Sequence, residues 1–209
     1  MERARAARVH GDPLGEFRVW PGPPPPALRA RLRAYLNAAI SEAPLQRFLE
    51  ASPVVLVRHL PGGHARWVIP GSRFVARFAP DFLIGDQQAS RPRWTLVELE
   101  SPSVRLFTQS GEPTRTLNHA IARVRGWRGW LRDHARYARE RLNLPNVGAD
   151  AHALILIGRR ARLRPEDLPR RRRLAMEEKV IIHTYDWLVD GAPETHVPLR
   201  DTNTQARGR

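Results

Sequence analysis

The longest periodic segment of the chain, residues 115–141, limits the possible folds most. Apolar residues recur there at intervals of three and four, which predicts an amphipathic helix with one face in a hydrophobic core. The residues of that face are Leu117, Ala120, Ile121, Val124, Trp127, Leu131, Ala135 and Ala138. Short apolar runs at 94–100 and 153–157 are typical of buried strands. Strands and helices that succeed one another in this way predict an α/β fold.

The other expected elements are shorter, and their limits follow from local signals. Helices are expected at 27–40, 41–51, 170–176 and 185–189. Strands are expected at 54–57, 66–78, 81–85 and 180–182. Ser41 is a candidate N-terminal cap for the second helix. The strand at 66–78 is expected to be interrupted near Pro70-Gly71.

Length and composition favour one folded domain. A chain of 209 residues that is 42% hydrophobic can bury a sizeable core. Residues 1–24 form a charged segment that ends in a run of prolines, which we interpret as an irregular basic arm and a stiff spacer. The folded domain is then expected over 25–193, with a loose C-terminal tail over 194–209.

Charge points to a polyanionic partner. The 35 Lys and Arg residues exceed the 21 Asp and Glu residues and give a net charge of +14, which is typical of nucleic-acid binding. Disulfides and thiolate metal sites are excluded because there is no cysteine, and the spacing of the eight histidines does not favour zinc. No apolar run approaches membrane-spanning length, so we expect no membrane partner and a cytoplasmic location.

Three acidic residues fall on two of the expected strands. Alternation along 94–100 places Glu98 and Glu100 on one face, and Asp81 opens the strand at 81–85. Two carboxylates about 4 Å apart repel each other by roughly 4 kcal/mol at an effective dielectric of 20, so a shared proton or a cation is needed. The alternative is that both glutamates point into water at a strand end and that Asp81 is a turn residue.

Arginines at intervals of three and four follow the long helix, largely opposite its apolar face. They are Arg125, Arg128, Arg132, Arg136 and Arg139. With only Asp133 interrupting them, we interpret them as contacts to a nucleic-acid phosphate backbone, and an ordinary solvated helix face is the alternative.

Other polar and aromatic residues have two interpretations each. Trp127 is more typical of core packing than of base stacking, and Trp130 lies at the edge of the apolar face. His119 is either catalytic or structural, and Arg170–Arg173 either contact nucleic acid or form a surface turn. Glu42 has a sufficient explanation in its favourable position near a helix N-terminus.

Several segments in order resemble the Shedu antiphage family, within the PD-(D/E)xK, or restriction-endonuclease-like, nuclease superfamily. The segments are SEAPLQRFLE (41–50) with Pro53 after it, PDFLI (80–84), LVELESP (96–102), LFT (106–108), HAI leading to Trp127 (119–127), IGRR (157–160) and TYDWL (184–188). The resemblance covers roughly residues 41–190. It implies a restriction-endonuclease-like core, in which helices flank a mixed central sheet, over the domain expected at 25–193.

The resemblance also assigns roles to residues. Asp81 and Glu98 are implied metal ligands for Mg²⁺ or Mn²⁺, and Glu42 is an implied accessory acid. Where the superfamily usually has lysine, this chain has Glu100, which either binds a second metal, acts as a base or marks a degraded site. Two further positions depart from the related pattern, because Gln109 stands where a lysine occurs in one branch and Arg123 where glutamine is usual.

The function implied is a metal-dependent DNA endonuclease for defence against phage. Cleavage would be hydrolysis of phosphodiester bonds, and homo-oligomers are left open. The first alternative is a nucleic-acid-binding pseudo-nuclease with the same fold and no cleavage. The second is a basic RNA-associated protein with an unrelated role.

Overall fold

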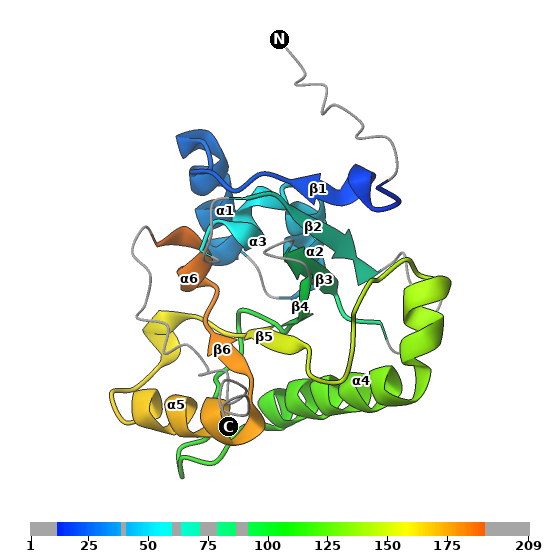
Figure 1. Ribbon diagram of the computed structural model, residues 1–209. Helices are drawn as coiled ribbons and strands as arrows, with labels where there is room; N and C mark the ends of the chain where they lie inside the picture. The colour runs from blue at the N-terminus through cyan, green and yellow to red at the C-terminus, as the bar shows by residue number, and fades with distance from the viewer. Residues whose placement is uncertain (1–11, 39–40, 60–63, 72–78, 87–91, 191–209) are drawn as a thin grey trace, which may run out of the picture.

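A computed structural model of the chain describes residues 12–38, 41–59, 64–71, 79–86 and 92–190. Its centre is a six-stranded sheet whose strands follow one another in chain order (Figure 1). The strands are β1 (Arg18–Val19), β2 (Arg66–Pro70), β3 (Phe82–Asp86), β4 (Arg93–Leu99), β5 (His152–Leu156) and β6 (Ile181–His183). Neighbours from β1 to β4 are antiparallel, whereas β4, β5 and β6 are parallel. The expected mixed sheet in an α/β fold is thus confirmed.

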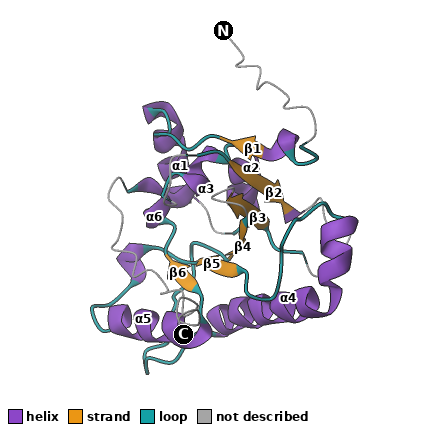
Figure 2. Cartoon of the chain, in the orientation of Figure 1, coloured by secondary structure: helices purple, strands orange, loops and turns teal. Residues whose placement is uncertain are grey.

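Helices cover both faces of this sheet (Figure 2). They are α1 (Pro26–Ala38), α2 (Ala43–Ala51), α3 (Val54–Val57), α4 (Arg115–Glu140), α5 (Asp167–Glu178) and α6 (Asp186–Val189), with short 3-10 turns η1 (Gly15–Phe17) and η3 (Arg160–Arg162). One face of the sheet packs against α4, and the other packs against α1, α2, α3 and α6. Parallel strands require crossover connections, and α4 and α5 provide them.

Helix α4 begins and packs as its apolar periodicity predicts. Thr114 caps it, with its hydroxyl accepting a hydrogen bond from the backbone N–H of Leu117 at 3.4 Å. Seven of the eight predicted apolar residues are buried, and Ala135 is half-buried. His134 has non-helical backbone angles (φ −123°, ψ 23°), and the helix changes direction there, as the end of α4 shows in Figure 1. The long apolar face upstream of this kink supplies much of the core on its side of the sheet.

Two local predictions were wrong. Residues 54–57 form helix α3 instead of a strand. All four residues of this run are apolar and most of them are buried. The sequence therefore contains no alternation of polar and apolar positions that would distinguish a helix from a strand. Ser41 does not cap α2, because Glu42 is the residue before the first helical turn and makes no side-chain capping bond. Of the strand expected at 66–78, β2 covers Arg66–Pro70, and residues 72–78 lie outside the described part.

The N-terminal segment departs from the expected domain boundary. Residues 12–19 belong to the folded unit, because β1 pairs with β2 and Leu14 is buried in the core on the α4 side. Asp12 accepts hydrogen bonds from Trp67 Nε1 and Arg18 Nη2, both at 3.0 Å. The expectation that all of 1–24 lies outside the core is therefore wrong for residues 12–19, while 1–11 and the expected tail at 194–209 lie outside the described residues. None of the helices in the described ranges is long and apolar enough to cross a membrane.

Leu14→Ala tests whether this segment stabilises the fold. Because Leu14 is only 5% exposed, we expect the free energy of unfolding to fall by roughly 2–5 kcal/mol. The matched control is Trp20→Ala, which removes a larger side chain that is 65% exposed and should have a much smaller effect. Urea denaturation of both variants measures the difference. If both variants lose the same small amount of unfolding free energy, residues 12–19 do not stabilise the fold.

Candidate acidic site at the end of strand β4

Strand pairing brings Asp81 next to Glu98. The backbone N–H of Asp81 donates to the carbonyl of Val97 at 3.1 Å, directly beyond the Phe82–Val97 pair of β3 and β4. The Asp81 carboxylate in turn accepts a hydrogen bond from the Leu99 N–H at 2.7 Å. Leu83 and Leu96 pack in the core beneath α4, and alternation along the strands places Asp81, Glu98 and Glu100 on the same side. The backbone thus directs the three acids to the sheet face that α4 covers.

Gly71 makes this close approach of the strands possible. Its N–H donates to the Asp81 carbonyl at 2.8 Å, and a Cβ at this position would lie 1.9 Å from the carbonyl oxygen of Pro80. Because that contact is with backbone, a side chain here would have to displace the segment that carries Asp81. The sequence signal was the Pro70-Gly71 interruption, whose role in positioning Asp81 only the structure reveals.

Burial dominates the electrostatics of the cluster. Glu98 is fully buried and Asp81 is 9% exposed. Burial raises the pKa of Glu98 to about 9, and the neighbouring charge of Asp81 adds to the shift, while Arg123 opposes it. Burial likewise raises the pKa of Glu42 to about 7, and Asp81 and Glu100 contribute to that shift. The pKa values of Asp81 and Glu100 are raised in the same direction and, first of all, by burial.

Among the described residues, Arg123 is the arginine that contacts this cluster. Its Nη1 lies 2.6 Å from Glu98 Oε1, and its Nη2 donates to the carbonyl of Ala79 at 3.2 Å. Its guanidinium also lies over the ring of Trp127, 5.6 Å from the centroid. The contact with Glu98 is an ion pair without the alignment of a hydrogen bond, because neither carboxylate oxygen of Glu98 has a hydrogen-bond partner in the described structure.

The remaining neighbours lie on α4 or directly before α2 and α6. Glu42 precedes α2 and interacts electrostatically with Asp81 and Glu100. His119, one turn before Arg123 on α4, places Nδ1 3.6 Å from Glu100 Oε1 while its side chain stays 65% exposed. Tyr185 is fully buried, and its hydroxyl has no hydrogen-bond partner among the described residues. Burial, and then the charges of Glu42 and Asp81, raise the Tyr185 pKa well above its usual value.

Sequence reasoning missed the placement of two residues in this site. Tyr185 was quoted only as part of a matching segment, and Arg123 only as a departure from the related pattern. Arg123 had a usable signal, because it follows His119 by four residues and therefore lies on the same side of α4. Tyr185 had none, since its approach to the acids depends on how β6 and α6 pack.

The donor set suits a hard divalent cation. Within the described ranges, no three His, Asp or Glu side chains are arranged to hold a metal ion together. Mg²⁺, however, usually binds through one or two carboxylates and completes its shell with waters and substrate phosphates. The buried Glu98 carboxylate without hydrogen bonds and the adjacent Asp81 carboxylate are oxygen ligands of the required kind. The residues therefore fit the metal that was expected, as a two-carboxylate site.

The five arginines of α4 do not form one free surface. Arg128 is half-buried and donates to the backbone carbonyls of Ala151, Glu178 and Lys179 at 2.8–3.2 Å. Arg125 pairs with the Glu178 carboxylate through two nitrogens. Arg136 forms an exposed pair with Glu140 at 2.9 Å, and Arg132 and Arg139 are exposed. Of the predicted phosphate contacts, Arg132 and Arg139 are thus exposed, Arg136 is exposed but paired with Glu140, and Arg125 and Arg128 contact the end of α5.

The other residues singled out in the sequence are also placed. Trp127 is buried in the core, as its position on the apolar face predicts, and half-buried Trp130 stacks on His134. Arg170–Arg173 lie within helix α5 rather than in a turn, where Arg171 is buried and Arg170 pairs with Asp167 at 3.3 Å.

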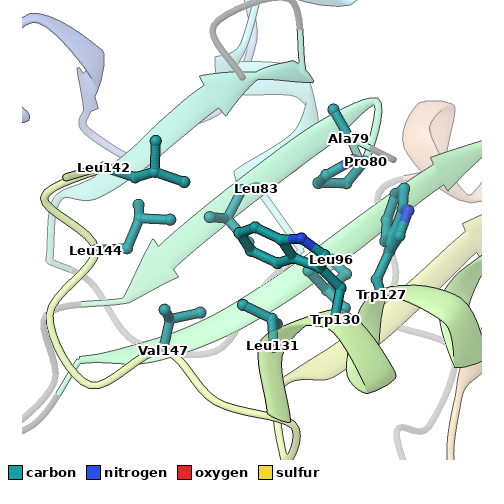
Figure 3. Close-up of a pocket in the computed structure, with 10 residues that line it drawn as sticks. All are labelled: Ala79, Pro80, Leu83, Leu96, Trp127, Trp130, Leu131, Leu142, Leu144 and Val147. Carbon is teal, nitrogen blue, oxygen red and sulfur yellow. The ribbon is translucent and has the colours of Figure 1, made fainter. Parts of the chain in front are cut away.

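An apolar pocket borders the acidic site. It is lined by Ala79, Pro80, Leu83, Leu96, Trp127, Trp130, Leu131, Leu142, Leu144 and Val147 (Figure 3). Ala79 and Pro80 directly precede Asp81, and Leu96 lies two residues before Glu98 on the same strand face. None of the described residues that line the pocket is charged, so this part of the lining offers no partner for a phosphate.

Metal-free stability should depend on pH through Glu98. Because its pKa is raised from 4.5 to about 9, the folded state binds the proton more tightly, and this stabilisation is lost as pH rises through that range. We expect stability in chelator to fall between pH 5 and 9, and Glu98→Gln to flatten that dependence. Urea denaturation at several pH values measures it, with exposed Glu112→Gln as control. A wild-type stability that rises over this range would contradict the assignment.

Comparison with known families identifies the chain. Residues 39–189 match the family model described as Shedu protein SduA, C-terminal. No curated protein matches the chain in sequence. The matched segment contains α2, both acid-bearing strands, α4 and the Tyr185 segment, and it confirms the resemblance to the Shedu family. Such a domain suggests a role in antiphage defence. With most of its 209 residues matched, the chain belongs to the Shedu family, in the part named for the C-terminal region of Shedu protein SduA.

Proposed function

We propose that this protein is a metal-dependent DNA endonuclease with a restriction-endonuclease-like core, acting in a Shedu-type antiphage defence system in the cytoplasm. The observation that carries the proposal is the fully buried Glu98 carboxylate, which has no hydrogen-bond partner among the described residues and lies among Asp81, Glu100 and Glu42, with Arg123 as its ion-pair partner. Buried carboxylates are costly unless they are protonated or paired, and one arginine cannot pair with four acids, so the excess of acidic groups favours a cation-binding role.

Each acid has a distinct proposed role. Asp81 and Glu98 would hold Mg²⁺ or Mn²⁺, which when bound supplies water activation and stabilises charge on the phosphate being cleaved. The Leu99 N–H orients the Asp81 carboxylate, and the strand pairing on both sides of β4 orients Glu98. Glu42, with a pKa near 7, is suited to exchange a proton at neutral pH. Glu100 lies beside His119 at the more open side of the cluster.

DNA would be held by charge rather than by shape alone. The net charge of +14 favours a polyanion over the whole surface. On α4, the exposed Arg132, Arg136 and Arg139 are the proposed phosphate contacts, whereas Arg125 and Arg128 hold α4 to the end of α5. Contacts of this kind carry no sequence information, so we expect little sequence preference from them.

One observation favours the pseudo-nuclease as the second candidate. Arg123 already supplies a positive charge at 2.6 Å from Glu98, so the cluster has a partner that belongs to the protein. Glu100 also stands where a lysine would assist hydrolysis in related enzymes. A protein of this kind would bind DNA through the same surface without cleaving it.

Cleavage of plasmid DNA in the presence of Mg²⁺ or Mn²⁺ tests the enzyme directly. We expect nicking by the wild type that chelator abolishes, and loss of both nicking and metal-dependent stabilisation in Asp81→Asn and Glu98→Gln. Their metal-free stability should hold or rise, because each change removes like-charge repulsion. Glu112→Gln is the matched control, since that exposed acid lies outside the cluster.

The negative results of this experiment are also informative. A wild type that neither nicks DNA nor binds Mn²⁺ by calorimetry would leave the pseudo-nuclease as the function. Activity created by Glu100→Lys in an otherwise inactive protein would identify a degraded nuclease site.

Salt dependence of duplex-DNA binding tests the arginine contacts. If Arg132, Arg136 and Arg139 each meet a phosphate, the triple glutamine variant should flatten the log–log salt slope by about 2–3. Arg128→Gln is the comparison, because it removes a charge whose nitrogens bind backbone carbonyls and should lower stability more than it changes the slope. An unchanged slope in the triple variant would assign these arginines to an ordinary solvated surface.

A further inference from the structure

Arg123 has an arrangement that an ordinary surface arginine lacks. Its guanidinium joins three groups: the Glu98 carboxylate at 2.6 Å, the Ala79 carbonyl at 3.2 Å and the Trp127 ring at 5.6 Å. Its side chain is 35% exposed, whereas the carboxylate that it faces is fully buried. The arginine therefore reaches from the solvent side of α4 to the innermost acid of the cluster.

The contact with Glu98 is the one that a metal would replace. A divalent cation bound to Glu98 needs a carboxylate oxygen at about 2.0–2.1 Å, and the Arg123 nitrogen already lies beside Oε1. Two cations at one buried carboxylate oxygen repel each other strongly, because the surrounding dielectric is low. The other two contacts of Arg123 do not involve an acid, so they can persist when the guanidinium tilts away from Glu98.

We propose that Arg123 is a built-in counter-ion for the ionised Glu98 carboxylate in the metal-free protein and must move aside when a divalent cation binds. The ion pair between Arg123 and Glu98 is not aligned as a hydrogen bond. Exchanging it for a bond between a metal and the carboxylate therefore costs less free energy. The partial exposure of Arg123 provides a path toward solvent. The charge of Arg123 thereby determines the concentration of divalent cation at which the site becomes occupied. This inference rests on the proposed metal-dependent function.

Binding of Mn²⁺ alone, measured by calorimetry on the full chain at constant pH, tests the proposal. Arg123→Gln removes the competing charge, so we expect Mn²⁺ to bind at least about tenfold more tightly, equivalent to about 1.4 kcal/mol. At pH values above about 9, where Glu98 is ionised, the same variant should be less stable than the wild type in chelator, because Glu98 loses its counter-ion. A purely structural role for Arg123 would lower metal-free stability without tightening metal binding, so the opposite signs of the two effects are diagnostic.

Three further variants complete the design. Arg123→Met keeps an unbranched stem over Trp127 and removes the same charge, so it replaces the glutamine variant if that one does not fold. Arg123→Lys keeps the positive charge and should bind Mn²⁺ less tightly than either neutral variant. Arg141→Gln removes an exposed arginine directly after the same helix and should leave the Mn²⁺ affinity at the wild-type value.

The outcomes separate this inference from the proposed function. Tighter binding in the neutral variants supports the inference, including the case in which the wild type shows no binding at all. Equal or weaker binding in those variants, beside measurable binding in the wild type, overturns the inference and leaves the metal-dependent function standing. Absence of binding in the wild type and in every variant overturns both.

Discussion

The burial of the Glu98 carboxylate is the constraint on which the rest of the site depends. β4 is paired on both sides, with Val97 next to Phe82 on β3 and Glu98 next to Ile155 on β5. The strand therefore cannot rotate or shift to release the acid into water without breaking the centre of the sheet. Its charge can be relieved only by a proton, by a basic side chain or by an external cation. A proton, a basic side chain and a cation each act on the Glu98 carboxylate alone, so none of them requires the strand pairing of the sheet to change.

Helix α4 contacts the buried acids in its first half and is anchored to the end of α5 further along. His119 and Arg123 are one turn apart and face Glu100 and Glu98. Further along, Arg128 satisfies carbonyls at the end of α5, where Lys179 has left-handed backbone angles and the helix ends. Terminal helix carbonyls lack partners within the helix, so a guanidinium that binds them holds the two crossover helices together. The position of Arg123 over the acids thus depends on an anchor elsewhere on the same helix.

Periodicity predicted the layers of this fold better than it predicted the roles of charged residues. The α4 core face and the acid-bearing strands follow from spacing, because burial imposes those periods on the sequence, whereas the mixed sheet was implied by the family resemblance. The arginines of α4 have the same spacing, yet Arg128 bonds to backbone and Arg132 is exposed. What separates them is the position of α5 and β5, which no local pattern encodes. The helix at Val54–Val57 and the docking of Leu14 were missed for a similar reason, since both depend on contacts made by tertiary packing.

The place of the acids in the sheet explains why several elements converge on them. β4 is the strand at which the antiparallel part of the sheet meets the parallel part. The antiparallel neighbour β3 contributes Asp81 at its beginning, beside the end of β4 that carries Glu98 and Glu100. The parallel neighbour requires a crossover helix, so α4 must return across the same face and brings Arg123 with it. An acid pair from two antiparallel strands and a basic residue from a parallel crossover can meet only at such a junction. The contact between Arg123 and Glu98 is therefore a consequence of the topology, and under the proposed function it is the contact for which a divalent cation would compete.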